Sequence, residues 1–173
     1  MRIGFDAKRA LNNFTGLGNH ARILLNAMMR AFPQHEYQLF SPKANDRLLN
    51  ELHGDFKIAL PAKSIINKGG LWRSWGVTHE LINRHINIYH GLSNELPLNI
   101  HGAGIKTVVT IHDLIFLKHT DQYPFIDRRI YEAKTRYAAK HADRIIAVSN
   151  ETKADLISFY KTPADKIEVI YPS

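Results

Sequence analysis

The segment from Thr107 to Leu114 constrains the fold more than any other part of this sequence. Its first five residues, Thr-Val-Val-Thr-Ile, are all β-branched, and the run then ends abruptly at His112 and Asp113. A continuous run of this kind is typical of a strand in a parallel sheet that helices cover on both faces. In such open α/β sheets, ligands bind at the carboxyl ends of the strands. His112 is therefore the first candidate for chemistry.

Strand-like runs alternate with helix-like segments along the whole chain. This order predicts an α/β fold, with a doubly wound, mainly parallel, Rossmann-like sheet of about seven strands and right-handed crossovers. A loop is predicted at residues 64–70, after the strand predicted at 57–60 and before the helix predicted at 71–84. Strands are predicted at residues 2–5, 37–40, 57–60, 87–89, 106–111, 144–148 and 167–170, and helices at 18–31, 44–52, 71–84, around 126–140 and after Ser149.

Two helices are expected to be amphipathic. In the helix at 18–31, an apolar side would be formed by His20, Ile23, Leu24, Ala27, Met28 and Ala31. In the helix around 126–140, the apolar side would be formed by Ile126, Ile130, Ala133 and Tyr137. The outer face of this second helix would be basic, with Arg128, Arg129, Lys134, Arg136 and Lys140.

The length and composition predict one domain spanning residues 1–173. A hydrophobic content of 45% is enough for a core. Asp6 and Lys8 interrupt any signal-like apolar segment, and no run approaches the about 18 apolar residues of a membrane span. Because the chain has no cysteine, it forms no disulfide and no thiolate metal site. A cytoplasmic location is expected.

The net charge of +7 favours an acidic partner. Part of the basic charge around 128–140 is expected to pair with Glu132 along the helix surface. The remaining face is interpreted either as a solvated surface or as one that binds an acceptor or an anionic membrane. Nucleic acid is not expected, because the basic residues are not interleaved with aromatic side chains that stack on bases.

Polar or small residues follow several of the predicted strands. Since parallel strands end at one edge of a sheet, Asp6, His90, His112, Asp113 and Ser149 should line one crevice. His90 is also explained as a half-buried histidine bonded to backbone. Ser149, or its neighbour Asn150, is equally explained as the cap of the following helix.

The segment Thr15–Asn19 lies between the first strand and its helix. Its two glycines allow close approach of a ligand, and its amides could bind an anion, although a plain loop with a capping glycine explains the spacing equally well. The segment fits neither the dinucleotide fingerprint nor a Walker loop. A trio of His112, Asp113 and His119 is not supported as a metal site, and no G-x-S-x-G or H-E-x-x-H motif indicates a hydrolase.

Several motifs in order resemble the amino-terminal domain of family 4, GT-B-type glycosyltransferases. They cover nearly the whole chain except residues 42–85. The matching segments are Asp6 with Thr15–Gly18, then Thr110–Leu114, Ala142–Ser149 with Thr152–Leu156, and Lys166–Tyr171.

The resemblance implies a transferase that moves a sugar from a nucleotide-sugar donor to an acceptor hydroxyl, with retention of configuration. In this family the glycine loop, here Gly16, Leu17 and Gly18, approaches the donor diphosphate, and the catalytic position beside the transferred sugar corresponds to His112. Asp6, Asp113 and Ser149 are assigned to donor-phosphate or acceptor binding. The resemblance implies no metal and no cofactor besides the nucleotide-sugar co-substrate, and the acceptor would be a glycan or a lipid-linked sugar.

The family's donor-binding carboxyl-terminal domain is expected to be absent from these 173 residues, which would form the single acceptor-side, Rossmann-like half. Alone, the chain is expected to transfer no sugar. Peripheral contact with an anionic membrane is compatible with the basic helix. The alternatives are a non-catalytic Rossmann-like binding or interaction module and, less well supported because of its poor fingerprint, an oxidoreductase domain.

Overall fold

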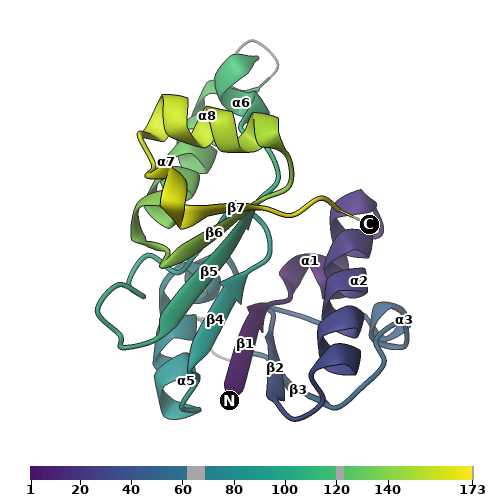
Figure 1. The fold of residues 1–173 in the computed structure, drawn as a ribbon. Helices are drawn as coiled ribbons and strands as arrows, with labels where there is room; N and C mark the ends of the chain where they lie inside the picture. Colours follow the sequence, from purple (N-terminus) through teal and green to yellow (C-terminus); the bar gives the residue numbers. More distant parts are fainter. Residues whose placement is uncertain (62–68, 120–122, 173) are drawn as a thin grey trace.

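An entirely parallel sheet runs through the domain, with helices on both sides (Figure 1). The computed structural model describes residues 1–61, 69–119 and 123–172, and in this part seven strands pair in the order β3-β2-β1-β4-β5-β6-β7. The doubly wound, Rossmann-like architecture is therefore confirmed. The strands are β1 (Arg2–Asp6), β2 (Glu36–Phe40), β3 (Phe56–Ala59), β4 (Ile88–Gly91), β5 (Lys106–Ile111), β6 (Arg144–Ala147) and β7 (Ile167–Val169).

Two groups of buried side chains hold the sheet between its helices. One group surrounds β1 and β2 and includes Phe5, Leu11, Leu25 and Leu39, and the other surrounds β4 to β7. The helices are α1 (Lys8–Asn12), α2 (Gly16–Ala31), α3 (Asp46–Leu49), α4 (Gly69–Leu71), the π-helix η1 (Trp72–Gly76), α5 (Val77–Asn83), α6 (Ile115–Lys118), α7 (Phe125–His141), α8 (Asn150–Tyr160) and the 3₁₀ helix η3 (Ala164–Lys166).

The β-branched strand β5 lies in the interior, between β4 and β6. Val109 and Ile111 are fully buried, as the continuous run predicts. The hydroxyls of its two buried threonines have partners, since Thr107 Oγ1 donates to Asp143 Oδ2 at 3.0 Å and Thr110 Oγ1 lies 2.9 Å from His90 Nε2. These bonds offset the cost of burying polar atoms in a strand that reaches the site.

The helix α2 forms where expected but buries a different side. Its buried residues are Gly18, Ala21, Arg22, Leu25 and Met29, whereas Ile23 of the predicted apolar side is exposed. The buried Arg22 fixes this orientation, because its Nη1 donates to the carbonyl oxygens of Ala10 and Asn13, both at 3.0 Å. The 3.6-residue period thus predicts the helix, and a tertiary contact sets its rotation.

The same correction applies to α7. Ile126 and Ile130 of its predicted apolar side are 71% and 48% exposed. The buried residues of α7 are instead Thr135, Ala138 and Ala139, in its second half. The first half of this helix therefore presents apolar side chains to solvent.

The region predicted as one helix at 71–84 is divided into α4, η1 and α5. Residues 64–68 of the predicted loop lie outside the described residues, and Gly69 and Gly70 already belong to α4. The helix predicted at 44–52 is restricted to α3, which Asn45 caps by accepting the N–H of Arg47 at 3.0 Å. The short helices α1 and α6 were not predicted.

Candidate active site

The strand ends predicted to carry the site lie along one edge of the sheet. Asp6 ends β1, His90 is the penultimate residue of β4, and His112 directly follows β5. Parallel pairing of β1 with β4 and of β4 with β5 brings these ends together. The start of α2 lies beside them, because the ring centroid of His20 is 5.5 Å from that of His112 and Leu17 lines the same pocket as His112.

His112 is held by two contacts to the loop after β4. Its backbone N–H donates to Asn94 Oδ1 at 2.9 Å, and its ring Nε2 lies 2.9 Å from the carbonyl oxygen of Leu92. A carbonyl only accepts, so Nε2 carries a proton and donates it to Leu92. The ring nitrogen left for a ligand is therefore Nδ1.

Asn94 fixes the point where β5 leaves the sheet. It has a positive φ of 57°, its N–H donates to the Thr110 carbonyl at 2.9 Å, and its Nδ2 donates to the Asp113 carbonyl at 3.2 Å. Together with its bond to the His112 N–H, these contacts bind the backbone on both sides of the histidine. The position of His112 is thus determined by the backbone rather than by packing of its ring alone.

Ser149 and Asp113 have local structural roles next to this point. Ser149 Oγ accepts the N–H of Thr152 at 3.0 Å and so caps α8. The Thr152 hydroxyl in turn donates to the His112 carbonyl at 3.0 Å. Asp113 is exposed, and its Oδ1 accepts the N–H of Ile115 at 3.2 Å. Both residues line a hollow of about 230 Å³ on the α8 side of His112.

The glycine loop forms the first turn of α2, and its two glycines differ. A Cβ on Gly18 would lie 1.9 Å from the carbonyl oxygen of Asn13, so close packing requires this glycine. A Cβ on Gly16 would meet nothing within 4 Å. The Thr15 side chain does not cap the helix, and in the described part of the chain the N–H groups of Gly16 and Leu17 have no hydrogen-bond partner. These two amides remain available to an anion at the positive end of the helix.

An ion-pair network extends from the buried residues Asp6 and Arg73 to the pocket wall and was not foreseen in the sequence. Arg73 of η1 binds Asp6 Oδ2 through Nη2 at 2.5 Å and through Nε at 2.7 Å, and it also pairs with Glu95. Lys134 of α7 lies 3.4 Å from both oxygens of Glu95. We call Asp6, Arg73, Glu95 and Lys134 the ion-pair network.

The network changes the role expected of Asp6. Asp6 is only 3% exposed, and its carboxylate is engaged by Arg73 rather than open to a ligand. Burial by itself would lower the pKa of Arg73, but the carboxylates of Asp6 and Glu95 raise that pKa above its ordinary value. Arg73 therefore stays charged and joins β1 to the loop after β4, and Glu95 of that loop pairs in turn with Lys134 of α7.

Two further histidines lie near His112, which lines the pocket. The His20 ring meets the His112 ring edge-on at 88°, and burial followed by the charge of His112 lowers the pKa of His20. His90 is buried, and burial lowers its pKa to about 4, so its ring is neutral near pH 7. Sequence reasoning named His90 and His112 and did not include His20 in the site.

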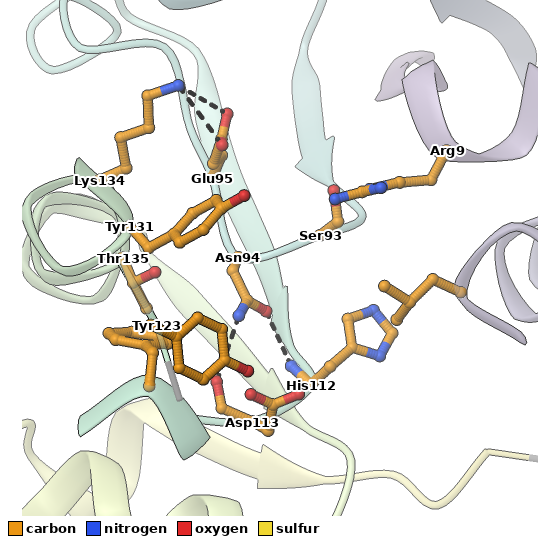
Figure 2. Close-up of a pocket in the computed structure, with 12 residues that line it drawn as sticks. Arg9, Ser93, Asn94, Glu95, His112, Asp113, Tyr123, Tyr131, Lys134 and Thr135 are labelled. Atoms are coloured by element: carbon orange, nitrogen blue, oxygen red, sulfur yellow. Dashed lines mark hydrogen bonds and ion pairs between the residues drawn. The ribbon is translucent and has the colours of Figure 1, made fainter. Parts of the chain in front are cut away.

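These elements enclose a pocket of about 210 Å³ (Figure 2). Figure 2 shows Arg9 on one side and Tyr131, Lys134 and Thr135 of α7 on the other, with His112 and Asn94 between them. Of the predicted site residues, Leu17, His112 and Asp113 line it. Asp6, Gly18 and Ser149 support its walls, and Arg9, Glu95, Tyr131 and Lys134 are additional lining residues.

Comparison with known proteins agrees with this geometry. The family model for Glycosyltransferase Family 4 matches residues 14–173. The chain belongs to glycosyltransferase family 4. The motifs from the glycine loop to the last strand lie within the matched region of this family 4 domain. No curated protein sequence matches the chain significantly.

Solved structures show that the family 4 domain has the fold of one GT-B half. The Anabaena protein HepE, solved in complex with UDP and glucose, matches with a TM-score of 0.63 and 17% identity, over 100% of this chain and 44% of HepE. A glycosyltransferase from Rickettsia africae matches with a TM-score of 0.53 and 16% identity, over 98% and 42%. The lipopolysaccharide outer core galactosyltransferase WaaB, in its apo form, matches with a TM-score of 0.58 and 16% identity, over 99% and 45%. The family 4 domain thus spans less than half the length of each.

Among residues 1–61, 69–119 and 123–172, no helix combines the length and apolarity needed to cross a bilayer. In the same residues, no group of three or more His, Asp or Glu side chains is arranged to hold a metal ion.

Proposed function

We propose that this family 4 domain is the acceptor-side half of a GT-B glycosyltransferase. The enzyme would move a sugar from a nucleotide-sugar donor to an acceptor hydroxyl, with retention of configuration. The observation that supports the proposal is that Leu17, at the start of α2, and His112 line one pocket, while the N–H groups of Gly16 and Leu17 have no hydrogen-bond partner among the described residues. An anion site and a fixed hydrogen-bonding group next to each other suit a sugar diphosphate.

In the proposed reaction, the diphosphate binds at the first turn of α2. The Gly16 and Leu17 N–H groups and the helix dipole stabilise the negative charge that grows on the leaving phosphate. Nδ1 of His112 contacts the transferred sugar, while its bond to Leu92 keeps the ring in place. Among the described residues that line the pocket, no side chain is placed as an activated nucleophile. The leaving phosphate then accepts the proton of the acceptor hydroxyl, and the protein contributes orientation and charge stabilisation.

A second Rossmann-like domain would provide the other wall of the cleft and bind the nucleotide. The proposal is supported by the share of HepE, WaaB and the Rickettsia protein that the chain covers, which is below half in each case. The UDP and glucose in the HepE complex favour a nucleoside-diphosphate sugar as donor and make UDP-glucose a suitable first probe. No metal and no cofactor beyond this co-substrate enter the proposal. The domain alone should transfer no sugar.

We further propose cytoplasmic placement with peripheral contact to an anionic membrane, and a glycan or lipid-linked acceptor. The first half of α7 supports this, because Phe125 and Ile126 are 64% and 71% exposed. The guanidinium carbons of Arg128 and Arg129 each lie 5.5 Å from the centroid of the Phe125 ring. Apolar and cationic side chains on one exposed helix segment suit the interface of a membrane that contains acidic lipids. The pocket residues Tyr131 and Lys134 are on the same helix.

The test of the reaction uses the domain together with the polypeptide that supplies the donor-binding half. His112→Ala should lower kcat for sugar transfer about 100-fold, as expected for loss of one preorganised group. His53→Ala, a substitution of an exposed histidine before β3, is the matched control and should leave kcat unchanged. Near-normal turnover by His112→Ala would remove His112 from the mechanism. Measurable transfer by residues 1–173 alone would overturn the proposal that sugar transfer requires a separate donor-binding half.

A further inference from the structure

The pocket beside His112 contains a cation that the ion-pair network does not use. Arg9 projects from α1 toward the loop after β4, in the direction of Ser93 (Figure 2). Arg9 is half-buried. Within residues 1–61, 69–119 and 123–172, its guanidinium has no ion pair and no hydrogen bond. Lys134 on the opposite wall is, by contrast, paired with Glu95.

Both acidic side chains that line the pocket are already committed. Glu95 is shared by Arg73 and Lys134, and Asp113 accepts the N–H of Ile115. In the part of the chain that the structure describes, neither carboxylate is within ion-pair distance of Arg9. The Arg9 side of the pocket therefore presents a positive charge without a carboxylate partner.

The pKa of Lys8, the residue next to Arg9, reflects the positive charge in this corner of the domain. Burial lowers the pKa of Lys8, and the positive charges of Arg73 and Arg9 lower it further, against a smaller opposing effect of Glu95 and Asp6. This corner of the domain thus disfavours another cation. An anion bound at Arg9 would reduce the repulsion among these three basic groups.

The size and walls of the pocket limit what can bind there. Its volume of about 210 Å³ is below the about 300 Å³ at the lower end of small-molecule sites, so it fits one ring-sized group. Tyr123 and Tyr131 provide aromatic faces, and Ser93 and Asn94 provide polar groups. Aromatic walls with a few polar groups suit a single sugar ring.

We propose that this pocket is an acceptor subsite for a sugar that carries a carboxylate or a phosphate, and that Arg9 binds this anionic group. The inference rests on the proposed function, because it names the acceptor of the same site. The guanidinium would bind the carboxylate or phosphate through two parallel hydrogen bonds. The donor diphosphate is the other possible anion, so the experiment has to separate the two.

The test measures binding to the chain of residues 1–173 by amide chemical-shift changes in NMR spectra. The probes are methyl glucuronide, glucose 6-phosphate, neutral methyl glucoside and UDP. Both acidic sugars should shift the amides of the loop after β4 and of Asp113 at millimolar concentrations. Arg9→Gln should raise their Kd about tenfold and leave the weak binding of methyl glucoside unchanged. Arg9→Lys should recover part of the lost affinity.

Arg30→Gln, which removes an exposed arginine of α2 away from the pocket lining, is the matched control and should bind all probes like the unmodified chain. Three results would overturn the subsite: no binding of either acidic sugar, binding that Arg9→Gln leaves unchanged, or dependence on Arg9 for UDP alone. Binding is measured without transfer, so the two proposals can fail separately. Binding that depends on Arg9, in a protein with no transferase activity, would retain the subsite and reject the proposed function.

Discussion

Gly18 and Asn13 are in such close contact that any side chain at position 18 would collide with the backbone. A Cβ on Gly18 would lie 1.9 Å from the Asn13 carbonyl oxygen and 3.0 Å from that of Arg9. The Asn13 carbonyl cannot move freely, because it also accepts a hydrogen bond from the buried Arg22. The start of α2 is therefore fixed against the loop that leads into it.

Gly18→Ala should destabilise the domain by about 2 kcal/mol, because overpacking of this kind forces the backbone to shift. Gly16→Ala is the matched control in the same turn, where a Cβ meets nothing within 4 Å, and it should change the free energy of unfolding by less than about 0.5 kcal/mol. Urea unfolding followed by circular dichroism measures both. Equal stabilities of the two variants would show that the Gly18 contact is not constraining.

Asp6→Asn should be strongly destabilising, with a loss of about 3 kcal/mol in the free energy of unfolding. The substitution removes one of the two carboxylates that hold the buried Arg73, and an incompletely paired buried charge is costly. Asp127→Asn, at an exposed position of α7, is the control and should have little effect. If urea unfolding gives Asp6→Asn the stability of the control, the ion-pair network does not contribute to holding the fold.

The stability of the domain should fall below pH 6.5 because of His90. Its pKa is about 4 in the folded state against 6.5 for an ordinary histidine, so between these values the unfolded chain binds more protons. The contribution of about 3 kcal/mol is complete above pH 6.5 and is lost as the pH falls toward 4.

His90→Gln removes this titration and should flatten the dependence of the unfolding free energy on pH in that window. Exposed His53→Gln should leave the slope unchanged. Urea unfolding at several pH values between 4 and 7 measures the slopes. A slope that persists in His90→Gln would assign the acid sensitivity to other groups.

Reversal of charge on α7 should abolish membrane binding. Arg128→Glu, Arg129→Glu and Arg136→Glu combined should prevent sedimentation with vesicles that contain phosphatidylglycerol, since each basic residue near an anionic surface contributes about 1 kcal/mol. The combination Arg30→Glu, Lys43→Glu and Lys57→Glu changes the net charge equally at exposed positions elsewhere and should still bind. Equal vesicle binding by the two triple variants, or no vesicle binding by the unmodified chain, would reject the membrane contact of α7 and show that this helix surface only faces solvent.

The sequence predicts the sheet well because β-branched runs such as Thr107–Ile111 are determined locally. The strand ends, including Asp6 and His112, follow from the same runs. The rotation of α2 and α7 does not, because the buried sides depend on contacts such as Arg22 with the loop before α2. A helical period fixes the spacing of apolar residues but leaves the buried side to the neighbouring elements.

The predicted site combined residues that line the pocket with residues that only support it. Leu17, His112 and Asp113 line the pocket, whereas the hydroxyl of Ser149 accepts the N–H of Thr152 and the carboxylate of Asp6 pairs with Arg73. The ion-pair network escaped prediction because its members come from four distant segments. No local pattern around Arg73, which lies between two tryptophans, indicates that its partners are residues 6 and 95.

The π-helical turn at Trp72–Gly76 has a consequence for the length of this segment. A π-turn holds one residue more than an α-turn, so loss of one residue there would give an uninterrupted α-helix from Gly69 to Asn83. Successive side chains of an α-helix are rotated by about 100° around the helix axis. The guanidinium of Arg73 would then point away from Asp6. The chain can therefore accept substitutions in this turn more readily than a deletion, because the number of residues in the turn decides whether Arg73 still joins β1 to the loop after β4.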